Sequence, residues 1–301
     1  MAIYYLHMKT FGRSAGHRAT SAAAYRAGER IRDERSGRVY NHVGREDVLH
    51  REILLPAELE RAGAAMDWAR DRARLWNAAE HAESRINARV AREYMVALPV
   101  ELVPEQRLGL ARTFAQELAD RYRFAVDLAI HAPRNDPRNY HAHLLATTRE
   151  VGPNGMGAKT WLDVSGPERQ RRALPPTAEE LKRVRERWAT LTNGALRSAN
   201  IDARVSHLSY AAQGSSRVPG RHLGRPADLG APAAGSEPSG TTDALSALER
   251  LQEQARNNWL ELRRRAAAPS PVAASARTRD SEAHLAEAAL SPGHRDFSAG
   301  D

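Results

Sequence analysis

The stretch IHAPRNDPRNYHAHLLATTR, residues 130–149, decides how this chain is expected to fold. Before it, residues 124–130 carry an apolar side chain at every second position, which is typical of a β-strand. Residues 140–148 are again apolar and rich in strand-forming types. The segment between them contains two prolines, two asparagines and an aspartate, and these residue types favour turns. The sequence therefore predicts an antiparallel hairpin.

Three histidines fall on this hairpin. Side chains two residues apart in a strand share a face, so His141 and His143 point the same way. His131 ends the partner strand and would join them at one end of the sheet. Imidazole is the commonest metal ligand in proteins, and three of them leave coordination positions open for a substrate. The pattern predicts a metal site, and the alternative is a set of solvated histidines beside a loop.

Length and composition exclude several classes of protein. The chain has 301 residues, 42% of them hydrophobic, enough for one large domain or two small ones with a sizeable core. It has no cysteine, so neither disulfides nor thiolate metal sites can form. No segment approaches the ~18 consecutive apolar residues of a membrane span, and the N-terminus shows no secretion signal. These features fit a cytoplasmic protein without stable membrane insertion.

The charge is unevenly distributed along the chain. Of the formal net charge of +8, residues 226–301 contribute −3, so the first 225 residues carry +11. A phosphate backbone is the partner that such a balance most often implies. Only three of the 45 basic residues are lysines, and alanine is abundant, as expected for a GC-rich genome. The arginine content is therefore not by itself evidence of nucleic-acid binding.

The remaining pattern predicts an α+β protein: an antiparallel sheet of about five strands, with helices packed on its faces. Strands are expected at 2–9, 51–56 and 94–99, with a final short one at 204–210. Helices are expected at 19–30, 64–92, 103–120 and 177–200, a loop or short hairpin at 31–49, and a turn at 152–157. Residues 226–244 read as a flexible linker, and residues 245–301 as a helical segment and a disordered tail.

Tyr25 is the second candidate for chemistry. It lies in the alanine-rich helix expected at 19–30, where Gly28 is a weak point. A phenol becomes a usable nucleophile when cations or a metal stabilise its oxyanion, and Arg18 and Arg26 lie nearby in the sequence. Taken alone, this segment favours an ordinary aromatic side chain that packs against the sheet.

Together, a tyrosine, three histidines and a basic surface indicate phosphoryl transfer from a DNA strand. The candidate DNA contacts are Arg13, Arg18 and Arg26, because guanidinium groups bind phosphate bidentately, together with the basic side chain of Lys9. His7 is a further weak candidate, because strand 2–9 would bring it near the metal hairpin if this strand were central in the sheet. Glu83 and Glu93 are weaker candidates for carboxylates that support the metal ligands.

The sequence resembles the MobA/MobL family of plasmid mobilisation relaxases, the MobQ class of the HUH endonucleases. The matching stretches, in order, are residues 1–7 with 9–10, 23–29, 76–80 through 97–99, 130–131 with 139–143, and 211–214 with 222–224. They cover residues 1–225, which the resemblance implies are a DNA-nicking domain. The sequence departs from the family pattern in three places. Tyr140 stands where the family usually has a proline, and the region 163–177 is shorter than in the family. The tail after residue 226 shows no helicase or primase, unlike the larger relatives.

The resemblance implies that Tyr25 is the nucleophile and that His131, His141 and His143 bind Mg²⁺ or Mn²⁺. It implies that the protein nicks one strand at a plasmid transfer origin (oriT) and forms a 5′-phosphotyrosine. The implied partners are single-stranded origin DNA, accessory relaxosome proteins and the coupling protein of a type IV secretion apparatus, which carries protein and DNA into a recipient cell.

Three other functions fit parts of the pattern. A rolling-circle replication initiator uses the same chemistry, although the position of Tyr25 upstream of the histidines favours a relaxase. A catalytically silent DNA-binding protein would keep the basic groove alone. In a small metallohydrolase the metal would activate water, and Tyr25 would only pack.

Overall fold

The predicted antiparallel sheet is present. The computed structural model describes residues 2–133 and 138–216, and the predicted linker at 226–244 and the segment 245–301 lie outside these residues. Five strands form the sheet in the order β1-β5-β7-β6-β4, and every neighbouring pair is antiparallel. Their bounds are β1 Leu6–Gly12, β4 Val48–Leu54, β5 Arg89–Ala97, β6 Val126–His131 and β7 His141–Ala146.

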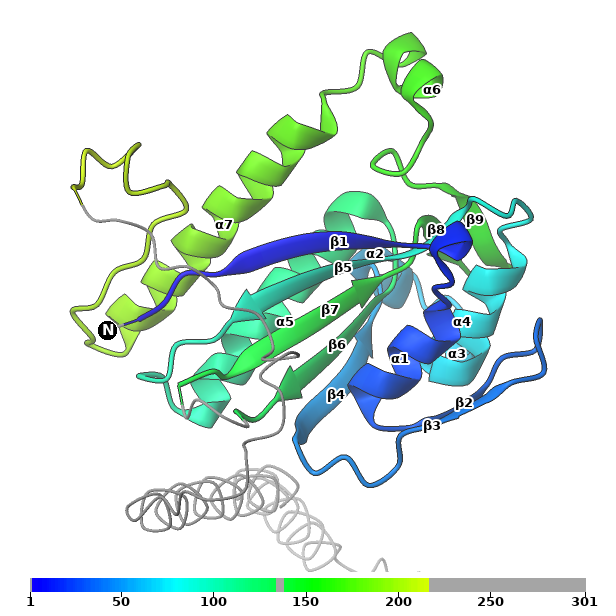
Figure 1. The fold of residues 1–301 in the computed structure, drawn as a ribbon, viewed down its shortest axis with the longest axis horizontal. Helices are drawn as coiled ribbons and strands as arrows, with labels where there is room; N and C mark the ends of the chain where they lie inside the picture. Colours follow the sequence, from blue (N-terminus) through cyan, green and yellow to red (C-terminus); the bar gives the residue numbers. More distant parts are fainter. Residues whose placement is uncertain (1, 134–137, 217–301) are drawn as a thin grey trace, which may run out of the picture. The chain divides into compact units, whose positions relative to one another are not determined.

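Helices and two small hairpins surround the sheet (Figure 1). The helices are η1 Arg13–Ala15, α1 Ala19–Ala27, α2 Ala57–Arg61, α3 Asp67–Arg70, α4 Arg72–His81, α5 Pro104–Tyr122, α6 Gly166–Arg171 and α7 Thr177–Ser198. The hairpins pair β2 Arg30–Arg32 with β3 Val39–Asn41, and β8 Arg149–Gly152 with β9 Gly155–Lys159. Among the described residues, no helix is long and apolar enough to cross a membrane.

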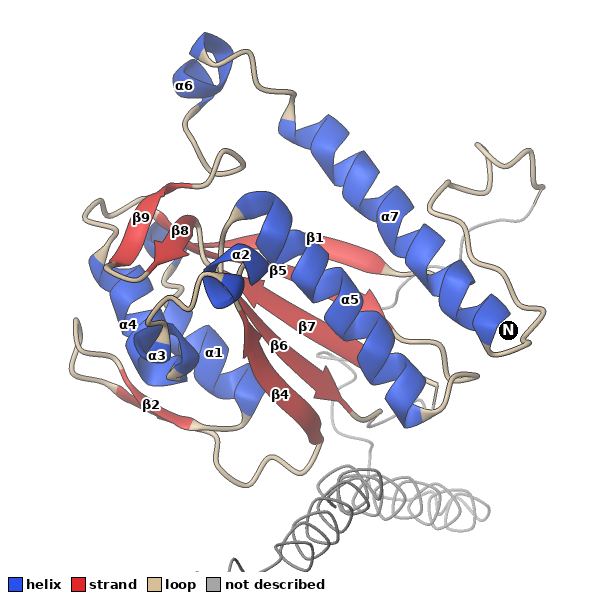
Figure 2. Ribbon diagram, turned by 180° about the vertical axis from the view of Figure 1, so that it is seen from behind, coloured by secondary structure: helices blue, strands red, loops and turns tan. Residues whose placement is uncertain are grey.

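Helices α5 and α7 belong to the apolar core on one face of the sheet, and Figure 2 shows α5 lying across this face. Leu110, Phe114 and Leu118 recur every four residues on α5, so they form one stripe that packs against the alternate apolar residues of the strands. The Phe114 ring also lies 4.9 Å from the Trp188 ring of α7. This larger core leaves the opposite face of the sheet available for a site.

The opposite face is only partly covered. The alanines of α1 pack there together with Trp76 of α4 and strand residues that include Leu145. Small side chains let α1 approach the sheet closely. On β7, Leu145 is the last residue of this apolar cluster. The residues two and four positions before it on the same face are His143 and His141. The sheet therefore passes from core to a polar surface within one strand.

Two predicted elements are wrong, and a third is shorter than expected. The helix expected at 64–92 is divided into α3, α4 and the start of β5, because the side chain of Asp71 accepts from the Arg74 N–H and starts a new helix. Ile86, an apolar residue within that range, is 80% exposed. No strand forms at 204–210; the side chain of Asn193 instead pairs with the backbone of Val205. The helix at 19–30 ends at Ala27.

Gly28 ends α1 for a conformational reason. Its φ is +63°, and a Cβ there would lie 3.3 Å from Cγ2 of Val48. We expect Gly28→Ala to lower the free energy of unfolding by roughly 1–2 kcal/mol, because a left-handed conformation is strained for alanine. Urea unfolding measures this. Gly109→Ala in α5, which meets nothing within 4 Å, is the control and should not destabilise. Equal stability of the two variants would contradict this role of Gly28.

Candidate metal centre and nucleophile

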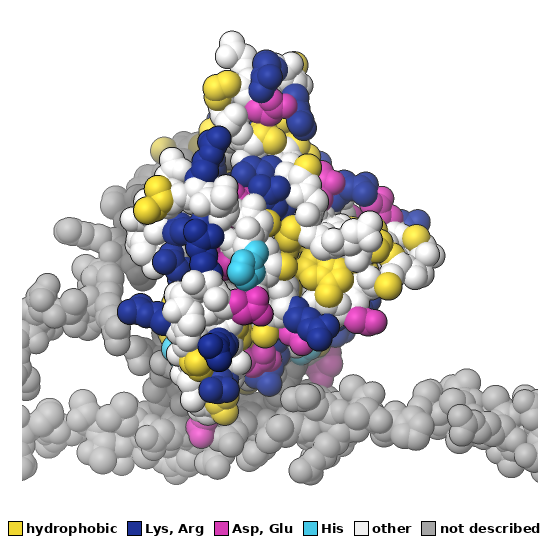
Figure 3. Space-filling model, turned by 90° about the vertical axis from the view of Figure 1, so that its right-hand side faces the viewer, with side chains coloured by type: hydrophobic (Ala, Val, Ile, Leu, Met, Phe, Trp, Pro, Cys, Tyr) yellow, Lys and Arg dark blue, Asp and Glu magenta, His cyan; other side chains and the backbone are white. Residues whose placement is uncertain are grey.

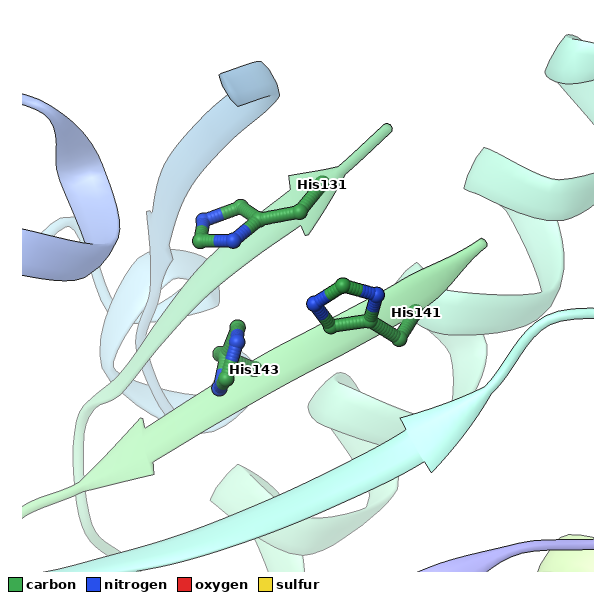
Figure 4. A group of neighbouring side chains, drawn as sticks. All are labelled: His131, His141 and His143. Atoms are coloured by element: carbon green, nitrogen blue, oxygen red, sulfur yellow. The ribbon is translucent and has the colours of Figure 1, made fainter. Parts of the chain in front are cut away.

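His131, His141 and His143 meet on one face of the central strands. His131 is paired with His141, and Ala129 with His143, so the antiparallel register brings the three side chains together. One nitrogen from each ring lies within 4.8 Å of the others. The ring centroids are 4.7–5.4 Å apart, and Figure 4 shows the three imidazoles turned toward one another. The predicted convergence is confirmed, and this arrangement could hold one metal ion.

Each imidazole is oriented by an oxygen that accepts a hydrogen bond. Nε2 of His131 donates to the Arg26 carbonyl at 2.8 Å, and Nδ1 of His141 donates to the Asn139 carbonyl at 2.8 Å. Nδ1 of His143 donates to Oε1 of Glu93 at 2.7 Å. In a neutral imidazole the second nitrogen then carries a lone pair. All three rings are thus held in a tautomer that suits metal binding.

Burial keeps these rings neutral. His131 is 1% exposed, and burial, with a smaller effect of His143, lowers its pKa to about 3. Burial likewise lowers the pKa of His141 and of His143. Burial alone would raise the pKa of the Glu93 carboxyl, but hydrogen bonds from His143 and Arg26 outweigh it and lower that pKa. Neutral imidazoles beside an ionised carboxylate are the protonation states that a metal ligand set needs.

The two carboxylates proposed to support the ligands lie in different places. Glu93 contacts His143, Arg26 and Lys9, whose Nζ is 3.1 Å from Oε2. Glu83 instead pairs with Arg149 and Lys159 of the β8–β9 hairpin, each at 2.8 Å. Glu93 therefore lies next to a ring of the triad, whereas Glu83 is engaged elsewhere and does not fit the supporting role.

Tyr25 is not packed against the sheet. Its side chain is 45% exposed on α1, and the Arg45 guanidinium lies 3.9 Å from the centre of its ring. Arg45 also donates to the Tyr25 carbonyl at 2.8 Å. The His42 ring approaches edge-on, with ring centroids 5.3 Å apart. The packing alternative for Tyr25 does not fit this environment, which leaves the phenol open to a substrate.

Two connections place the phenol-bearing turn of α1 beside the histidines. The residue after Tyr25 is Arg26, whose carbonyl accepts from His131. The second connection runs through side chains: Nε of Arg45 donates to Asp47 at 2.9 Å, and the other Asp47 oxygen lies 3.8 Å from Nδ1 of His131. Arg45 and Asp47 cannot be singled out from the sequence, because nothing in the local pattern separates Arg45 from the other arginines of 26–51.

The four predicted DNA contacts differ in accessibility. Arg13 is 6% exposed and bound by Glu80 and three backbone carbonyls, and Arg26 is 8% exposed and paired with Glu93. A phosphate-binding role does not fit these two arginines. Arg18 is half-buried and bonds the His17 carbonyl, while the side chain of Lys9 is 47% exposed. Other Lys and Arg side chains gather on the face that holds both small hairpins (Figure 3).

His7 lies outside the histidine triad. His7 was expected near the metal if the first strand were central, but β1 lies at the edge of the sheet. His7 is paired with Met95, which is paired in turn with His143, so one strand separates the two histidines on the same face. His7 is exposed, and its ring lies beside that of Tyr5, with ring centroids 6.4 Å apart, rather than approaching the triad.

Comparison with known proteins places this site in a family. The family model "MobA/MobL family" matches residues 17–229, and the chain belongs to this family. It is 39% identical to "Mobilization protein MobL" of Acidithiobacillus ferridurans over 247 residues, 74% of this chain and 62% of that protein. It is 36% identical to "Mobilization protein A" of Escherichia coli over 233 residues, 74% of this chain and 30% of that protein. The chain thus spans less than two thirds of each relative.

A solved structure supports the same fold. The chain is similar, with a TM-score of 0.59 and 31% identity, to the structure described as "Molecular Basis of Vancomycin Resistance Transfer in Staphylococcus aureus". The similarity covers 69% of this chain and all of that chain. The predicted α+β fold, an antiparallel sheet of about five strands with helices on its faces, is therefore confirmed for the described residues.

Proposed function

We propose that this chain is a DNA relaxase that nicks one strand at a plasmid transfer origin and becomes attached to it through Tyr25. The observation that carries the proposal is the position of an exposed phenol one residue before the backbone carbonyl that orients His131. Membership of the MobA/MobL family supports the same assignment. We assign the nicking activity to residues 1–225.

In the proposed step, Oη of Tyr25 bonds to phosphorus while the bond from phosphorus to the 3′ oxygen breaks. The phenol gives up its proton, and the 3′ oxygen gains one, which leaves a 5′-phosphotyrosine and a free 3′ hydroxyl. The ester keeps the energy of the broken bond, so rejoining needs no ATP. Arg45 holds the phenol ring from one side, and its charge favours the developing oxyanion.

The histidine triad supports a divalent cation as cofactor. His131, His141 and His143 would hold it, and Glu93 would orient His143. Bound there, Mg²⁺ or Mn²⁺ would neutralise a non-bridging phosphate oxygen and help to align the phosphodiester. The substrate follows from this chemistry as single-stranded origin DNA. Accessory relaxosome proteins and a type IV secretion coupling protein, with transfer from the cytoplasm to a recipient cell, belong to the same proposal.

Covalent capture tests the proposal. The protein is incubated with Mn²⁺ and single-stranded oligonucleotides that tile the DNA beside its gene, and the products are separated in SDS. A relaxase should give an SDS-stable protein–DNA adduct at a transfer origin. An adduct only at a replication origin would indicate a rolling-circle initiator. A cut without an adduct would indicate a metallohydrolase, and binding without a cut would indicate a catalytically silent DNA-binding protein.

Arg45→Ala should slow adduct formation about tenfold. The variant loses the guanidinium over the Tyr25 ring, a contact worth about 1–2 kcal/mol when partly desolvated, and the bond to the Tyr25 carbonyl. Single-turnover capture with saturating DNA measures the rate. Arg112→Ala is the control, because Arg112 forms a two-bond ion pair with Glu52 on a different element. A wild-type rate for Arg45→Ala would show that Tyr25 is positioned without it.

A further inference from the structure

A row of exposed side chains continues from the triad to the edge of the sheet. Tyr5, His7 and Lys9 alternate along the N-terminal segment, so they lie on one face of it. The pairing of His7 with Met95, and of Met95 with His143, makes this the face that carries the histidines. Lys9 binds Glu93, the carboxylate that also binds His143. The row therefore begins next to the candidate metal centre.

The two rings of this row are accessible and nearly parallel. Tyr5 is 43% exposed and His7 is also exposed. Their ring centroids are 6.4 Å apart, and the ring planes differ by 30°. Stacked bases in DNA are separated by about 3.4 Å, so this separation is close to twice the base step. A flat base that enters between two rings at this separation would contact both of them.

Charge argues for a nucleic-acid occupant rather than an apolar peptide. The ammonium of Lys9 lies two residues from His7, and its side chain is half-exposed. A basic group next to stacked aromatic rings is the combination that binds single strands, since the rings take bases and the cation takes the adjoining phosphate. Paired bases in a duplex are already stacked and cannot enter between two rings.

We propose that Tyr5 and His7 sandwich one unpaired base of the DNA strand that crosses the triad, and that Lys9 binds the phosphate next to that base. This inference rests on the proposed relaxase function, because it names how the same site holds its substrate strand. The row would fix one nucleotide at a set distance from the scissile phosphate, and so contribute to the choice of the phosphodiester that is cut.

Fluorescence anisotropy with a single-stranded origin oligonucleotide in EDTA tests binding without cleavage. Tyr5→Leu and His7→Leu should each weaken binding about tenfold, as expected for the loss of one base-stacking contact. Tyr5→Phe keeps the ring and should restore the affinity. Ile86→Ala, which removes an exposed apolar side chain before β5, is the control for a nonspecific surface effect. Thermal unfolding of each variant reports whether its fold is intact.

An abasic scan locates the base. In the wild-type protein, removal of one particular base should weaken binding about tenfold. In Tyr5→Leu, removal of the same base should cause no further loss of affinity. Equal affinities of wild type and Tyr5→Leu for the intact strand would overturn the proposal. The proposal would also be overturned if Tyr5→Leu bound every abasic oligonucleotide about tenfold more weakly than wild type does, because the Tyr5 ring would then not contact a base.

The outcome is separable from that of the relaxase proposal. If the wild-type protein forms the covalent adduct but both leucine variants bind normally, the sandwich alone fails. If no oligonucleotide gives an adduct but the abasic scan shows the expected coupling, the base site stands and the nicking function fails. Lys9→Ala should reduce the salt dependence of binding by about one phosphate contact. Lys182→Ala on α7 should leave the salt dependence unchanged.

Discussion

Tyr25→Phe is expected to abolish the covalent protein–DNA adduct, with a fall of more than ~10³-fold in its rate of formation, as for loss of a nucleophile in other enzymes. The substitution removes only Oη. The phenylalanine ring can keep its place under the Arg45 guanidinium, and because the position on α1 is exposed, the free energy of unfolding should change by no more than ~0.5 kcal/mol. Capture in SDS, with single-stranded DNA and Mn²⁺, measures the adduct.

Binding of the same DNA should be retained by Tyr25→Phe, because the phenol makes its covalent bond only in the reaction. Tyr210→Phe is a matched control, since Tyr210 is exposed to a similar extent and lies after α7. It should form the adduct at the wild-type rate. An adduct of undiminished yield with Tyr25→Phe would place the nucleophile on another residue and remove the basis for the proposed mechanism.

The hairpin and its three histidines could be predicted because the information is local. Alternation, turn residues and the histidine spacing all lie within one stretch, and β6 pairs with β7 directly. For β5 the prediction was only partly right, because a strand was expected at 94–99 but residues 89–92 were assigned to the preceding helix. Arg92 and Glu93 stand where that predicted helix ends and the strand begins, and both look like surface charges, yet both are buried. Their partners, Asp163 and His143, are 71 and 50 residues away in the chain.

Partners that are distant in the sequence also explain why two of the candidate DNA contacts do not fit that role. Arg13 and Arg26 resemble surface arginines in a basic segment, but each is paired with a buried glutamate that lies 67 residues away. A sequence pattern does not reveal such a partner. Arg45 was missed for the converse reason: it looks like any other surface arginine in the sequence, but the fold places it against the ring and the carbonyl of Tyr25. The convergence of the three histidines was thus predictable from the sequence, whereas the side chains around them could be identified only from the fold.

His143→Ala should reduce the affinity for Mn²⁺ by more than ~100-fold, because loss of a ligand exceeds the 10–100-fold cost of losing a residue that only supports one. Isothermal titration with Mn²⁺ measures this without DNA or cleavage. Glu93→Gln should have the smaller effect: the amide oxygen can still accept from Nδ1 of His143, but the negative charge is gone. His81→Ala is the control, since that ring is half-exposed on α4 and pairs with Glu34.

Salt-dependent binding of single-stranded DNA should largely survive in His143→Ala, because phosphate contacts made by basic side chains do not require the metal. Adduct formation should fail, so the variant separates binding from chemistry. Unchanged Mn²⁺ affinity in His143→Ala would contradict the metal assignment even if cleavage were lost. Normal cleavage with weakened Mn²⁺ binding would mean that the cation is not needed for the attack by Tyr25.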